Sequence, residues 1–84
     1  MSLEKYRKMI EDIDIKMMDL FEKRMQVSLL IGKYKKDHQL PILDNSREIE
    51  ILNKRKQQLN NDELWPHYES FIKEIMRLSK EYQK

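Results

Sequence analysis

The chain has 84 residues, of which 38% are charged, with one Gly, two Pro and no Cys. This composition predicts a single all-α domain over residues 1–84, with short loops between helices. The net charge of +2, with bases interleaved among acids, does not indicate a nucleic-acid binder. Without Cys there are no disulfides or thiolate metal sites. Without a signal peptide or a long apolar run, we expect a cytoplasmic protein that does not enter a membrane.

The first predicted helix runs from about Leu3 to Lys36. Apolar residues recur along it at alternating steps of three and four, which is typical of a helix packed along one face. They are Leu3, Tyr6, Ile10, Ile13, Met17, Leu20, Val27, Ile31 and Tyr34. Such a helix spans about 45–50 Å, longer than a compact domain of this size. This apolar stripe therefore needs a partner, and we expect a homodimer.

Arg24 interrupts the apolar stripe at a position where a guanidinium must lose water and meet an anion, from the protein or from a ligand. Lys35 lies about 16 Å further along and points in nearly the same direction, which leaves room for a small anion. Arg7 lies about 25 Å away and roughly 100° around the helix, so it could serve this site only from an antiparallel partner. Taken alone, Arg24 could instead set the register of a coiled coil, and Lys35 could be a solvated charge.

A linker and a second helix follow. The proline in residues 40–43 disfavours helix at the residue before it. Asp44 or Asn45 then caps the second helix, and Asn45 and Glu48 have the spacing of a capping box. Asp44, Arg47 and Glu48 lie at the helix start, where amide donors and the helix dipole favour anionic groups. Asp44 and Glu48 could also be simple capping residues.

The third helix begins near Trp65, after a turn at residues 60–62, and continues to the end of the chain. Ser79 and Gln83 lie one turn apart on it, and both could be surface positions. Gly32 in the first helix indicates close packing. His38 and His67 match no metal motif. We expect the inward face of the third helix to carry Tyr68, Phe71, Ile72, Ile75, Leu78, Ser79 and Tyr82.

Taken in order, these residues resemble the all-helical chorismate mutases of the AroQ class, over essentially the whole chain. The resemblance implies an intertwined homodimer of three-helix protomers with two shared sites. It also implies an isomerase that rearranges chorismate, a dicarboxylate, to prephenate in phenylalanine and tyrosine biosynthesis, with no cofactor or metal. The similarity rests on Arg7 with Ile10, Ile13 and Asp14, on Glu22–Arg24, Gly32–Lys35, Leu40–Asp44, Arg47–Glu48 and Ile75–Ser79, and on Gln83.

The resemblance also implies which residues meet the substrate. Arg24 and Arg7 of the partner subunit would pair with the two carboxylates. Lys35 and Gln83 would donate to the ether oxygen, which gains charge as its bond to carbon breaks. Glu48 would accept from the ring hydroxyl. The full set implied to bind substrate is Arg7, Arg24, Lys35, Asp44, Arg47, Glu48, Ser79 and Gln83, and the catalytic members are Arg24, Lys35, Glu48 and Gln83.

The resemblance implies supporting roles for three members of this set. Arg47 would support the anionic region, Asp44 would act through helix-start geometry, and Ser79 would line the pocket. Two alternatives stay open: an isochorismate pyruvate-lyase on the same scaffold, and a non-catalytic helical dimer that senses an anionic metabolite. The Asp44, Arg47 and Glu48 group favours the mutase, because Glu48 is implied to meet the ring hydroxyl of chorismate.

Overall fold

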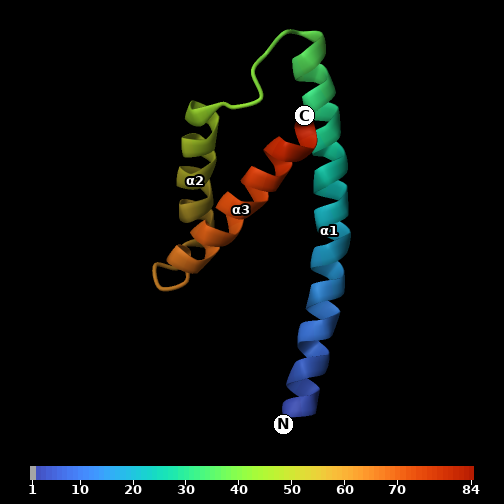
Figure 1. Ribbon diagram of the computed structural model, residues 1–84. Coiled ribbons are helices and arrows are strands. Elements are labelled where there is room, and N and C mark those ends of the chain that lie inside the picture. Colours follow the sequence, from blue (N-terminus) through green and yellow to red (C-terminus); the bar gives the residue numbers. More distant parts are fainter. Residues whose placement is uncertain (1) are drawn as a thin grey trace.

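The computed structural model describes residues 2–84, and this part of the chain forms three α-helices and no strand (Figure 1). The helices are α1 (Leu3–Asp37), α2 (Asn45–Leu59) and α3 (Trp65–Gln83). In Figure 1, α1 is a long rod, α2 runs back in the opposite direction, and α3 crosses from the end of α2 to α1. The all-helical prediction is confirmed, and α1 ends one residue later than predicted. None of the three helices is long and apolar enough to span a membrane.

Local hydrogen bonds fix the start of α2. The carboxylate of Asp44 accepts a hydrogen bond from the backbone N–H of Arg47 at 3.0 Å, so Asp44 is the N-cap. Asn45 is the first helical residue, and the predicted capping box with Glu48 was wrong. Glu48 instead reaches across to α3, because a lysine ammonium there offers it a charged partner.

The buried core is small and lies along α3. Trp65, Ile72 and Met76 are its buried apolar side chains, and α3 packs against both other helices. The backbones of α1 and α2 do not come together, so α3 is the element that joins them. Two residues expected on the inward face, Phe71 and Tyr82, are 50% and 49% exposed, because no second layer of this chain covers them.

Gly32 lies where α3 ends against α1. A Cβ atom on Gly32 would lie 2.5 Å from the carbonyl oxygen of Gln83 and 2.8 Å from its Cα. Both are backbone atoms, so no rotamer change could relieve the contact. The prediction that Gly32 marks close packing is confirmed, and this close approach fixes the last turn of α3.

The apolar stripe of α1 remains open in the single chain. Its nine apolar members are between 42% and 62% exposed. The N-terminal half of α1 extends beyond α2 and α3 as an isolated rod, and the described residues measure 55 × 26 × 16 Å (Figure 1). Contiguous apolar surface of this kind marks an interaction site.

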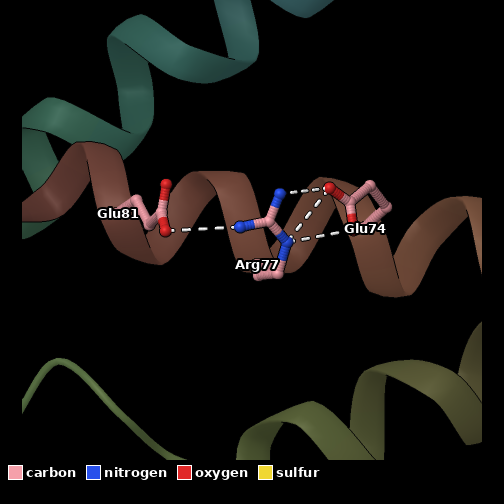
Figure 2. A network of polar contacts seen from close by, with 3 residues as sticks. All are labelled: Glu74, Arg77 and Glu81. Atoms are coloured by element: carbon pink, nitrogen blue, oxygen red, sulfur yellow. Dashed lines mark hydrogen bonds and ion pairs between the residues drawn. The ribbon is translucent and has the colours of Figure 1, made fainter.

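An ion-pair network runs along the exposed side of α3 (Figure 2). Arg77 donates from Nε to both carboxylate oxygens of Glu74 at 3.0 Å and from its guanidinium to Glu81 at 3.3 Å. The hydrogen bond from Arg77 lowers the pKa of Glu74. These pairs are one turn apart, so they support the helical conformation of the turns that carry Ser79 and Gln83.

Candidate active site

A cavity of about 510 Å³ lies among the three helices, within the range of small-molecule sites. Seven of the eight predicted site residues line it, and only Arg7 does not. The lining residues are Arg24, Val27, Ser28, Ile31, Lys35, Ile42, Asp44, Arg47, Glu48, Ile51, Arg55, Met76, Ser79, Lys80 and Gln83. The fold therefore gathers residues from three separate helices around one space.

Lys35 and Gln83 meet at one end of the cavity. The ammonium of Lys35 donates to the backbone carbonyl of Ile42 at 2.9 Å and to Oε1 of Gln83 at 3.4 Å. Because lysine is only a donor, the amide oxygen of Gln83 faces it and the amide NH₂ group stays available. Both side chains are half-buried. Together they can offer two N–H donors to an oxygen atom of a bound ligand.

Ser79 is buried and its hydroxyl hydrogen-bonds to that of Ser28 on α1. Ser28 also donates to the backbone carbonyl of Arg24 at 3.1 Å. With its one proton used there, Ser28 accepts from Ser79, so the pair ties α3 to α1 beneath the cavity. Sequence reasoning missed Ser28, although its place one turn after Arg24 puts it on the same side of the helix.

Glu48 forms an ion pair with Lys80 at 2.9 Å, which connects α2 to α3 across the cavity. Both side chains are partly buried, at 26% and 30% exposed. Lys80 was not predicted, although it lies one turn after the buried Met76 and therefore near the inward face. The ion pair fixes one oxygen of Glu48 and leaves the other free to accept.

Asp44 and Arg47 line the cavity, but their charged groups bind partners within α2. The Asp44 carboxylate caps α2, in agreement with a role through helix-start geometry. The guanidinium of Arg47 pairs with Glu50 on its own helix at 3.1 Å, and its side chain is 56% exposed. Arg47 therefore lies at the rim of the cavity and not at its floor.

Arg24 reaches the other end of the cavity without a protein anion. Within residues 2–84, no carboxylate forms an ion pair with it. Burial lowers the pKa of Arg24, and the nearby charge of Arg55 lowers it further. Arg24 nevertheless keeps an exposed surface in the single chain, so the expected full desolvation is not reached. Sequence reasoning missed Arg55, which lies on α2 two turns after Glu48.

Arg7 lies outside the cavity, as helix geometry predicted. Its side chain is 65% exposed and pairs with Glu4 at 3.1 Å. It lies near the N-terminal end of α1.

The sequence model of the family described as chorismate mutase type II matches residues 6–84. This chain belongs to the chorismate mutase type II family. The AroQ-class resemblance found in the sequence is thereby confirmed. The chain is also similar to a solved structure titled "Conserved hypothetical protein from Pyrococcus furiosus", with 35% identity and a TM-score of 0.75 over 98% of this chain and 95% of that chain. A comparison with curated protein sequences gave no significant match.

Membership in the chorismate mutase type II family agrees with the arrangement of the cavity. The matched region contains α2, α3, all of α1 except its first three residues, and every cavity residue. The cavity of this chorismate mutase type II chain is lined by the guanidinium groups of Arg24 and Arg55, which form no ion pair within residues 2–84, and by the amide and ammonium donors of Gln83 and Lys35. That distribution suits an anionic ligand with an oxygen atom remote from its charge.

Proposed function

We propose that this chain is a chorismate mutase that rearranges chorismate to prephenate in phenylalanine and tyrosine biosynthesis. The observation that carries the proposal is the single cavity in which Arg24, Lys35, Glu48 and Gln83 come together from three helices. Membership in the chorismate mutase type II family supports the same reaction.

The reaction needs charge placement rather than proton transfer. One carbon–oxygen bond breaks while one carbon–carbon bond forms, and the electrons move around a single ring of atoms. The ether oxygen gains negative charge as its bond lengthens. Lys35 and the free amide group of Gln83 would donate to that oxygen, and each such donor is typically worth about 3–4 kcal/mol of barrier. No cofactor enters these bond changes.

Glu48 would bind the ring hydroxyl of the substrate. Its ion pair with Lys80 holds the carboxylate at the cavity wall, and its second oxygen can accept a hydrogen bond from that hydroxyl. A substrate fixed at the hydroxyl and at the ether oxygen is held in the compact conformer that reacts.

The active unit would be a homodimer, with Arg24 and Arg7 of the partner subunit pairing with the two substrate carboxylates. The open apolar stripe of α1 and the distance of Arg7 from its own cavity support this assembly. A second copy would cover the stripe of the first in an antiparallel arrangement and bring Arg7 to the neighbouring cavity.

Ile13 and Ile15 provide a matched test of the dimer. They are 51% and 61% exposed in the single chain, and helix geometry places them about 200° apart, with only Ile13 on the stripe. We expect Ile13→Glu to dissociate the dimer and abolish activity, and Ile15→Glu to do neither. Sedimentation at several protein concentrations measures the oligomeric state of each variant. A dimer that persists in Ile13→Glu would contradict the proposed interface.

The reaction itself is tested by adding chorismate to the purified protein and following its loss by ultraviolet absorbance. Product analysis then separates prephenate from the products of an isochorismate pyruvate-lyase, with isochorismate as a second substrate. We expect prephenate from chorismate. Binding of chorismate without turnover would refute the enzyme and favour an anion-sensing dimer.

A further inference from the structure

The cavity contains more positive charge than the eight predicted residues provide. Its five cationic side chains are Arg24, Lys35, Arg47, Arg55 and Lys80. Arg47 and Lys80 have carboxylate partners, and Lys35 is held by a carbonyl and an amide oxygen. Among residues 2–84, neither Arg24 nor Arg55 forms an ion pair. Two guanidinium groups therefore share the cavity without a protein anion.

The course of the chain places these two arginines at the same end of the cavity. Lys35 donates to Ile42, just before α2, so α1 ends and α2 begins at that end of the cavity, and the two helices run away from it in the same spatial direction (Figure 1). Arg24 lies eleven residues before Lys35, and Arg55 lies eleven residues after Asp44, which is about 16 Å along each helix. Both side chains thus line the end of the cavity that is remote from Lys35.

Arg55 is directed to the cavity by its position on α2. Glu48, Ile51 and Arg55 follow at steps of three and four, and all three line the cavity. One guanidinium nitrogen of Arg55 donates to Gln58 at 2.9 Å. An arginine has five N–H donors, so the remaining ones are available to a ligand.

We propose that Arg55 is a substrate-binding residue that holds, together with Arg24, one carboxylate of the dicarboxylate substrate. This inference rests on the proposed function for the identity of the ligand. Two guanidinium groups repel each other when no ligand lies between them. An anion bound between them offsets that repulsion and accepts hydrogen bonds from both. This repulsion acts in the single chain, where burial lowers the pKa of Arg24 and the positive charge of Arg55 lowers it further.

Replacing Arg55 tests the inference, with Lys54 as the matched control. Arg55→Gln and Lys54→Gln each remove one positive charge from α2, but Lys54 is 59% exposed, pairs with Glu50 and does not line the cavity. We expect Arg55→Gln to raise KM for chorismate about 10- to 100-fold with kcat nearly unchanged. Lys54→Gln should match the parent, and Arg55→Lys should recover part of the loss, because the charge returns without the planar fork.

Binding is measured separately, by calorimetry with chorismate in a Lys35→Ala background that slows turnover. There, Arg55→Gln should weaken binding by the same factor. If the parent turns chorismate over and Arg55→Gln changes neither KM nor binding, the inference fails and the proposed function stands. If the parent shows no turnover, the proposed function fails, and calorimetry alone decides whether Arg55 binds the dicarboxylate. If Arg55→Gln weakens the dimer but leaves chorismate binding unchanged, a carboxylate of the partner subunit is its anion and the inference is overturned.

Discussion

Replacing Gly32 with alanine should reduce catalysis through the backbone of Gln83. The added Cβ would lie 2.8 Å from the Cα of Gln83, whereas carbon atoms pack best at about 3.5–4.0 Å. The last turn of α3 must therefore move by about 1 Å. Reacting groups displaced by that distance can lose about 100-fold in rate, so we expect Gly32→Ala to lower kcat by roughly 10- to 100-fold.

The folded state should survive the substitution. Overpacking a tight contact costs about 1–3 kcal/mol, and alanine returns about 1 kcal/mol over glycine inside a helix. Thermal unfolding should thus show a small loss of stability beside a large loss of rate. Lys33→Ala, at the exposed neighbouring position on α1, is the control and should keep the parental rate.

A double-mutant cycle isolates the cause. In a Gln83→Ala background the side chain that Gly32 positions is already absent, so Gly32→Ala should lower kcat little further. Initial rates of chorismate loss at saturating substrate give kcat for Gly32→Ala in the parent and in the Gln83→Ala background. The reasoning is refuted if Gly32→Ala alone retains the parental kcat, or if its effect is undiminished when Gln83 is alanine.

Three further substitutions test the proposed site. Lys35→Ala should lower kcat by roughly 100-fold or more, because a donor to the ether oxygen is lost, while Lys36→Ala should keep it; equal rates would remove Lys35 from the mechanism. Arg7→Ala and Arg24→Ala chains should each be inactive, yet mixing them should restore up to about a quarter of the activity, because one site of each heterodimer regains both arginines. Mixed dimers without any recovery would contradict a shared site. Gln83→Glu should be more active at acidic than at neutral pH, because only the protonated carboxyl group can donate; a flat pH–rate profile at full rate would mean that Gln83 does not contact the ether oxygen.

The helices could be predicted because their signals are local. The periodic apolar stripe defined α1 to within one residue, and proline and turn residues marked both connections. The choice between Asp44 and Asn45 as the cap depended on which side chain could reach the N–H of Arg47. That is a matter of backbone angles at a single residue, which composition does not reveal.

The contacts that shape the cavity were harder to predict, because they join distant parts of the chain. Family resemblance brought Ser79 and Gln83 into the site, but nothing local in the sequence pairs Ser28 with Ser79 or Glu48 with Lys80. Arg55 follows at the one-turn spacing shared with many solvated helix residues, so only the arrangement of the three helices around the cavity shows that it lines this space. Sequence spacing predicts which residues share a face of one helix, whereas the cavity is lined by residues from three helices.

The contact between α1 and α3 also determines the order in which the molecule can assemble. Ser28 and Ser79 are separated by 51 residues, whereas α2 and α3 are joined by a short turn. Closing the long loop has a larger entropic cost than forming the local hairpin of α2 and α3, and single helices form within about a microsecond. Helical structure therefore precedes the junction at Gly32, and the cavity exists only once that junction has closed. Recovery of the proposed activity after refolding would thus require this docking step and the assembly of the dimer, and circular dichroism of the helices detects neither.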